Sequence, residues 1–93
     1  MKNIVVEYSK NARKFLASNE QLLSVADANT LLAKAARKLL LYEENNTDVI
    51  ALQGKLKGLY RVRKGDIRMI FSLHNGIAVV VAVETIDFRG IVY

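Results

Sequence analysis

The residues that shape the backbone divide this chain into two parts near Gly54. There is no proline, and all five glycines lie at or after position 54. Only three residues between Ser9 and Asp48 are β-branched, whereas twelve valines, isoleucines and threonines follow Gly54. Because β-branched side chains favour strands and unbranched ones favour helices, we expect the first part to be mainly helical and the second part to form a sheet.

Length and composition limit the classes of protein that remain possible. A chain of 93 residues can build one small core, so we expect a single domain spanning residues 1–93. The absence of cysteine excludes a disulfide scaffold and a thiolate site, and the single histidine, His74, argues against a histidine metal site. We therefore expect no metal and no other cofactor.

Nothing in the sequence predicts export or membrane insertion. An acidic residue, Glu7, comes too early for a signal peptide. The longest apolar run, Ile77–Val83, is far shorter than the ~20 residues of a membrane-spanning helix. We expect a cytoplasmic protein with no membrane partner.

Hydrophobic periodicity predicts a strand and two helices before Gly54. Residues 3–8 should form the strand, and Ser9 should cap the first helix. The second helix should begin after a capping box at residues 18–21, or else at Asp27, and end at residues 43–46. The expected apolar stripes contain Ala12, Phe15 and Leu16 in the first helix and Leu32, Ala35, Ala36, Leu39 and Leu40 in the second. Such a helical hairpin needs a sheet to cover its apolar side.

Alternating hydrophobicity predicts the sheet after Gly54. Strands are expected at residues 59–64, 67–73 and 77–83, with a last short strand or tail at 88–93. The tight turns should lie at residues 64–66 and at His74-Asn75-Gly76. The expected fold class is α+β, with an N-terminal strand and a helical hairpin packed on a mostly antiparallel, twisted sheet.

Positive charge is concentrated in this second part. The net charge is +5, and the balance is +1 for residues 1–53 against +4 for residues 54–93. If the apolar residues of the two central strands face the helices, Arg61, Arg63 and Arg68 share the opposite face. Like charges on neighbouring strands are destabilising, so a phosphate-bearing ligand would account for the cluster. The alternative is three solvated arginines with Asp66 or Glu84 as partial counter-ions.

Two segments carry a resemblance to a known family. The hairpin Tyr60-Arg61-Val62-Arg63-Lys64-Gly65-Asp66-Ile67-Arg68 resembles the Tyr-Arg-x-Arg-x-Gly-Asp-x-Arg-like hairpin of the RelE/ParE toxin superfamily of bacterial toxin–antitoxin systems. The end, Arg89-Gly90-Ile91-Val92-Tyr93, is similar to the closing Arg-x-x-Val-Tyr of the same superfamily. The resemblance implies a compact toxin with a sheet like that of microbial ribonucleases. RelE-like toxins cut mRNA in the ribosomal A site, whereas ParE-like toxins inhibit DNA gyrase by binding it.

The resemblance also implies residue roles and partners. Its catalytic positions correspond to Arg61, Arg63, Arg68, Arg89 and Tyr93. Beside this resemblance, Lys55, Lys57 and Lys64 are candidate RNA contacts, with solvated loop lysines as the alternative for Lys55 and Lys57. Tyr93 favours the RelE branch, and many relatives carry histidine where this chain has Phe88. The implied partners are the ribosome, mRNA and a cognate antitoxin that could join the toxin in a hetero-oligomer. Gyrase inhibition and a non-toxic basic binding module stay open as alternatives.

Overall fold

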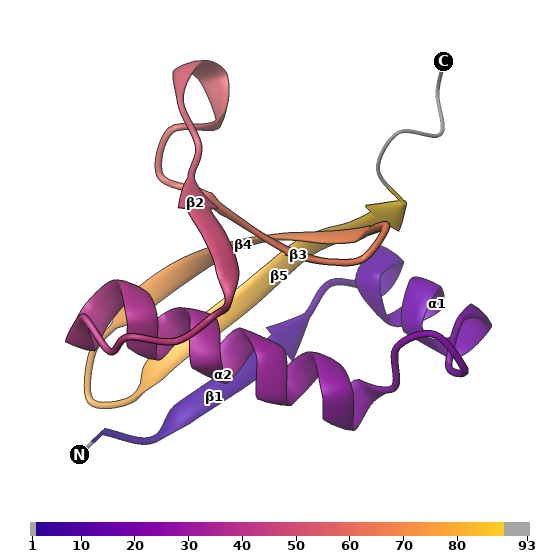
Figure 1. Cartoon of the computed structure of the whole chain (residues 1–93), viewed down its shortest axis with the longest axis horizontal. Helices are drawn as coiled ribbons and strands as arrows, with labels where there is room; N and C mark the ends of the chain where they lie inside the picture. The colour runs from indigo at the N-terminus through magenta and orange to yellow at the C-terminus, as the bar shows by residue number, and fades with distance from the viewer. Residues whose placement is uncertain (1, 89–93) are drawn as a thin grey trace.

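Two helices pack on one face of a five-stranded sheet (Figure 1). The structure, a computed structural model, describes residues 2–88. Its elements are β1 (Ile4–Tyr8), α1 (Lys10–Ser18), α2 (Val25–Leu41), β2 (Asp48–Ala51), the 3₁₀ turn η1 (Gly54–Leu56), β3 (Tyr60–Lys64), β4 (Ile67–Asn75) and β5 (Val79–Phe88). The strand order is β1-β5-β4-β3-β2, with β1 parallel to β5 and every other pair antiparallel. The expected α+β fold is confirmed.

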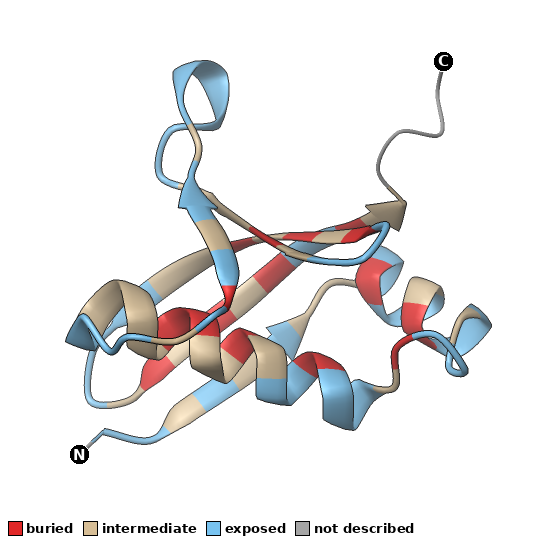
Figure 2. Ribbon diagram, in the orientation of Figure 1, coloured by how far each residue is buried: buried red, intermediate tan, exposed pale blue. Residues whose placement is uncertain are grey.

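The core lies between the helices and the inner face of the sheet (Figure 2). Val62, Met69 and Phe71 are buried there, and the ring of Tyr60 stacks on Phe71 with 5.6 Å between the ring centroids. The helices contribute the residues expected from their apolar stripes. The buried ones are Ala12 and Leu16 in α1 and Leu32, Ala35 and Ala36 in α2. This packing leaves the alternate side chains of β3 and β4 on the outer face.

The helix starts differ in part from the sequence expectation. Ser9 caps α1 as expected, because its hydroxyl accepts the backbone N–H of Ala12 at 3.1 Å. The capping box expected at residues 18–21 is wrong, because Asn19 bonds back to α1 and ends that helix. The capping box of α2 is formed instead by Ser24 and Asp27, each accepting a backbone N–H from the other residue.

This capping box predicts a local contribution to stability. Ser24→Ala should lower the free energy of unfolding by about 1 kcal/mol, because the backbone N–H of Asp27 loses its acceptor. Ser18→Ala, which removes an exposed hydroxyl at the end of α1, should change it by less than about 0.5 kcal/mol. Urea unfolding followed by circular dichroism measures both. An equal loss in the two variants would contradict the assignment of the cap.

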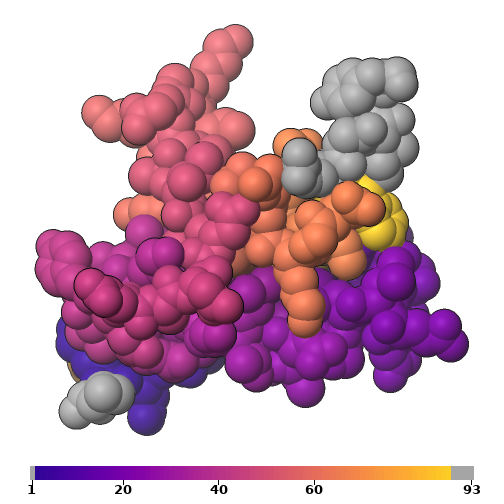
Figure 3. Space-filling view, viewed as in Figure 1, coloured from indigo at the N-terminus to yellow at the C-terminus, as the bar shows by residue number. Residues whose placement is uncertain are grey.

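The sheet is more extensive than expected. Strand β2 was not expected, and it forms one edge by pairing with β3. The segment between them, which includes η1, projects from the body of the molecule (Figure 3). His74 lies in β4 and not in a turn. The strand expected at 77–83 begins at Val79 and extends to Phe88, and the remainder of the segment expected at 88–93 lies outside the described residues.

A β-bulge in β5 reverses which side chains face outward. Ile70 pairs with Thr85 but Phe71 pairs with Val83, so Glu84 is an extra residue. Ser9 donates to this bulge, from its hydroxyl to the Glu84 carbonyl at 2.7 Å and from its backbone N–H to the Val83 carbonyl at 2.9 Å. After the bulge Ile86 is buried and Asp87 faces outward.

Within residues 2–88, neither α1 nor α2 combines the length and the apolar character that crossing a bilayer requires.

Candidate functional site

The outer face of the sheet carries a row of four charged residues across four strands. Asp48 in β2 pairs with Arg63 in β3, Arg63 pairs with Arg68 in β4, and Arg68 pairs with Asp87 in β5. Arg61 lies two residues before Arg63, on the same side of β3. The cross-strand register therefore brings the three arginines together on one face, as the alternation predicted. Below, Arg61, Arg63 and Arg68 are called the arginine cluster.

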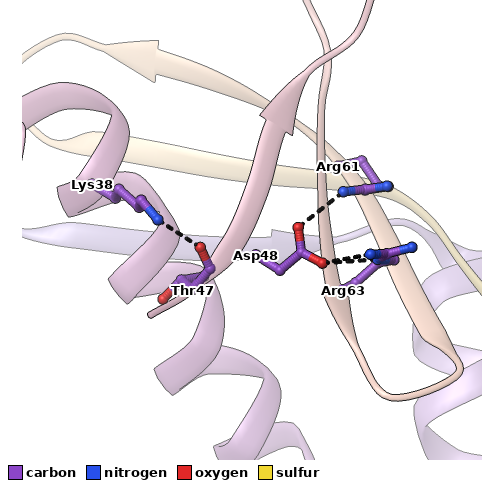
Figure 4. Close-up of polar contacts among 5 residues, drawn as sticks. All are labelled: Lys38, Thr47, Asp48, Arg61 and Arg63. Atoms are coloured by element: carbon purple, nitrogen blue, oxygen red, sulfur yellow. Dashed lines mark hydrogen bonds and ion pairs between the residues drawn. The ribbon is translucent and has the colours of Figure 1, made fainter. Parts of the chain in front are cut away.

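Two carboxylates hold the three guanidinium groups (Figure 4 shows the first). Asp48 bridges two of them, with 3.1 Å between its Oδ1 and Arg61 Nη2 and 2.8 Å between its Oδ2 and Arg63 Nη2. Arg68 donates two hydrogen bonds to Asp87, from Nε to Oδ1 at 2.7 Å and from Nη2 to Oδ2 at 3.2 Å. Within residues 2–88, each of the three arginines therefore forms an ion pair with one of these two carboxylates.

The arginine cluster is accessible to solvent to different degrees. The exposed fraction of the side chain is 18% for Arg61, 31% for Arg63 and 43% for Arg68. Nε of Arg61 is buried and has no hydrogen-bond partner in residues 2–88. A guanidinium fork that is partly open and already aligned on carboxylate oxygens has the geometry to bind phosphate oxygens, which accept the same paired hydrogen bonds.

The arginines also set the protonation of Asp48. The hydrogen bond from Arg63 is the largest effect and lowers the pKa of Asp48 below its usual value. Desolvation, the next largest effect, raises this pKa, and the charges of Arg63, Arg61 and Lys38 lower it. Lys38 in α2 donates to the carbonyl of Thr47 at 2.9 Å (Figure 4). It also donates to the carbonyl of Asn45 at 3.1 Å. Asp48 is therefore ionised at neutral pH and competes with any anion that approaches the cluster.

The other predicted site residues lie elsewhere or outside the described part. Lys64 is exposed at the end of β3, directly after Arg63. Lys55 and Lys57 lie on the projecting segment before β3, at the opposite end of that strand. Arg89 and Tyr93 lie outside the described residues. The structure thus places Lys64 next to Arg63 along β3 but, by the alternation of the strand, on the inner face with Val62, and it separates Lys55 and Lys57 from the arginine cluster.

Several groups that move protons in other enzymes lie away from the cluster. His74 is six residues from Arg68 along β4, about 20 Å at the rise of an extended strand, and is near Ser72. Burial raises the pKa of Tyr8 to about 12, and its hydroxyl donates to Asn29 on the helix side of the sheet. Phe88, at the position where many RelE/ParE toxins carry histidine, has no proton to exchange, and its ring packs against Phe15 with 5.0 Å between the centroids. The chemistry that the cluster itself supports is anion binding and charge stabilisation.

The counter-ions differ from those expected. Asp66 lies in the turn between β3 and β4, and Glu84 lies in the bulge of β5; neither makes an ion pair with an arginine in the described part of the chain. The partners are Asp48, on a strand that the sequence analysis did not predict, and Asp87, which the bulge turns outward.

Among residues 2–88 there is no cluster of three histidine or acidic side chains that would hold a metal ion.

Several solved structures share this arrangement of helices and strands. YafQ from E. coli strain BL21(DE3) is 16% identical with a TM-score of 0.63, covering 100% of this chain and 99% of its own. The YoeB/ParE toxin from Agrobacterium tumefaciens is 15% identical with a TM-score of 0.69, covering 96% and 99%. The toxin–antitoxin complex RelBE2 from Mycobacterium tuberculosis gives 19% identity and a TM-score of 0.58, covering 91% and 96%.

The chain has the fold of the RelE/ParE toxins. The likeness extends over nearly the whole of each chain, which confirms the resemblance at the level of the fold. No protein-family model matches the sequence, and a search of curated protein sequences finds no match either. At 15% to 19% identity the shared feature is the fold, so the activity has to be argued from the arginine cluster.

Proposed function

We propose that this protein is the toxin of a type II toxin–antitoxin system and acts as a ribosome-dependent mRNA endonuclease. The observation that carries the proposal is the arginine cluster, in which strand alternation and cross-strand register bring three partly exposed guanidinium groups together on the outer face. Like charges on neighbouring strands destabilise a sheet, and a polyanion such as RNA would neutralise them.

In the proposed reaction the 2′-hydroxyl of the RNA attacks the adjacent phosphorus, and the 5′-oxygen of the next nucleotide leaves. The attack places extra negative charge on the phosphate oxygens, which Arg61, Arg63 and Arg68 would stabilise through hydrogen bonds that are already oriented. Arg89 would bind a flanking phosphate or the leaving group. Tyr93 would stack on a base or exchange a proton with the 2′-hydroxyl.

Dependence on the ribosome is expected because the proposed site holds no side chain that exchanges protons readily at neutral pH. An arginine has a pKa above ~12 and an unperturbed tyrosine one of about 10, so neither exchanges protons readily at pH 7. His74 is too far from the cluster to help. We infer that the ribosome aligns the mRNA and completes the site, and that free RNA is cut poorly. Lys55 and Lys57, which lie on the projecting segment, would then contact ribosomal RNA.

Inhibition of DNA gyrase is the second candidate. The toxin from Agrobacterium tumefaciens carries both branch names, YoeB and ParE, so the fold supports either activity. A gyrase inhibitor would need the basic face only for binding. A cognate antitoxin is proposed as partner in both cases, because the Mycobacterium tuberculosis relative is a toxin–antitoxin complex. We propose the cytoplasm, where ribosomes and gyrase act, as the location.

Induced expression distinguishes the candidates. We expect arrest of protein synthesis within minutes, together with new mRNA 5′ ends at positions within reading frames. Pulse labelling of protein and DNA and sequencing of RNA 5′ ends measure both effects in the same culture. DNA damage with intact mRNA would instead identify a gyrase inhibitor, and normal growth at a verified level of folded protein would identify a non-toxic binding module.

A further inference from the structure

A pocket adjoins the arginine cluster at the edge formed by β2 and β3. It has a volume of about 360 Å³ and lies between α2, the start of β2 and the end of β3. Arg63 and Asp48 line it, so the pocket is continuous with the cluster. Its volume falls within the range of small-ligand sites, roughly 300–1,000 Å³. Below it is called the α2 pocket.

In the α2 pocket the acidic side chains have partners within the described residues, whereas the lysine ammonium groups do not. Its two acids are already engaged, since Asp27 caps α2 and Asp48 bridges two arginines. Its two ammonium groups, on Lys34 and Lys64, make no hydrogen bond or ion pair within residues 2–88. A pocket with satisfied acids and unpartnered ammonium groups attracts an anion, and lysine binds phosphate as a point charge.

The wall of the pocket is held in place before any ligand arrives. The backbone N–H of Thr47 donates to Asn45 Oδ1 at 3.0 Å, and Asn45 Nδ2 donates to the carbonyl of Lys34 at 3.2 Å. Lys38 then ties the Thr47 carbonyl to α2 at 2.9 Å. Thr47 is 4% exposed, and its hydroxyl oxygen has no partner in the described residues. This fixed wall reduces the entropy lost on binding.

We propose that the α2 pocket binds the nucleotide next to the scissile one, with its backbone phosphate between Lys34 and Lys64. The inference rests on the proposed function. Arg63 contributes to both sites, and it is one strand spacing, about 4.8 Å, from Arg68. Because Asp48 and Arg63 belong to the ion pairs of the cluster and also line the pocket, an RNA backbone would pass from the outer face around this edge of the sheet into the pocket. An acidic protein segment could bind the pocket without also contacting the arginine cluster, and the first test uses hexaglutamate to detect such binding.

The first test is a backbone amide NMR titration of the full chain with a tetranucleotide of 2′-O-methyl RNA, which cannot be cleaved. At low salt we expect signals of residues 61–68 and of Lys34 and Thr47 to shift together. Shifts confined to residues 61–68 would overturn the inference and leave the proposed function standing. No shift in either place would count against both. If hexaglutamate shifts the pocket signals and the RNA does not, the pocket belongs to a protein partner and the inference fails.

The second test assigns the contact to one phosphate. Lys34→Gln should weaken binding of the same RNA by about threefold to tenfold and reduce the slope of log K against log salt by about one. Lys14→Gln, on the exposed side of α1, should leave both unchanged. A neutral methylphosphonate at the flanking linkage should abolish the difference between Lys34→Gln and the parent chain. Equal affinity of Lys34→Gln and the parent for unmodified RNA would overturn the inference.

Discussion

Replacing Arg68 with alanine is expected to reduce cleavage of ribosome-bound mRNA by about 10²- to 10³-fold, the usual cost of removing one oriented donor to a transition-state anion. Arg68 presents Nε and Nη2 side by side to Asp87, so its fork is already aligned for two acceptor oxygens. Its removal also leaves the Asp87 carboxylate facing the phosphate. The measurement is kcat/KM from the appearance of new 5′ ends on programmed ribosomes.

Two further variants show whether the loss comes from the site. Arg68→Lys keeps the charge but not the fork, so its activity should lie between those of the parent chain and Arg68→Ala. Arg13→Ala removes an arginine from the exposed side of α1 and should cleave like the parent. Because exposed ion pairs contribute less than about 1 kcal/mol to stability, Arg68→Ala should remain folded. A folded Arg68→Ala with full activity would remove the arginine cluster from the mechanism.

The arrangement of the arginine cluster was predictable because strand alternation follows directly from sequence. Val62 and Met69 alternate with arginines, and a period of two fixes which side chains share a face. The register of the hairpin, with Arg63 opposite Arg68, follows from the short turn that contains Gly65. Gly65 has a φ of 59°, a conformation that glycine adopts without strain.

The counter-ions were not predictable, because both depend on tertiary structure. Asp48 begins a four-residue strand that is too short to show a period and is defined by pairing with β3. Asp87 would face the helices if β5 were regular, and the bulge that turns it outward is fixed by Ser9, 75 residues away from Glu84 in the chain. The α2 pocket likewise joins three elements, and its β3 residues are distant in the sequence from its α2 residues.

Asp48→Asn is expected to make the protein a tighter RNA binder. The ionised Asp48 now accepts hydrogen bonds from Arg61 and Arg63, so a phosphate must displace it to bind the same donors. Asparagine has nearly the same shape without the charge. We expect the dissociation constant for 2′-O-methyl RNA at low salt to fall by about threefold to tenfold, with a salt dependence steeper by about one ion. Fluorescence anisotropy across a salt series measures both quantities.

Asp66→Asn is the matched control, because it changes the net charge equally but lies in the exposed turn between β3 and β4. It should leave the dissociation constant nearly unchanged. If the two variants tighten binding equally, the effect is one of overall charge, and Asp48 does not compete with RNA for the arginines.

The pH dependence of stability gives an independent check on the same contact. The pKa of Asp48 is lower in the folded chain than in the unfolded one, where it is about 3.9, because Arg63 and Arg61 stabilise its charged form. Its ion pairs therefore stabilise the fold fully above about pH 4, and this contribution is lost as the pH falls through the lowered folded value. Asp48→Asn should be less stable than the parent chain at pH 7, and the difference should shrink on acidification, because a protonated Asp48 resembles asparagine. A difference in unfolding free energy that stays constant from pH 7 to pH 2 would mean that the charge of Asp48 does not hold the arginine cluster in place.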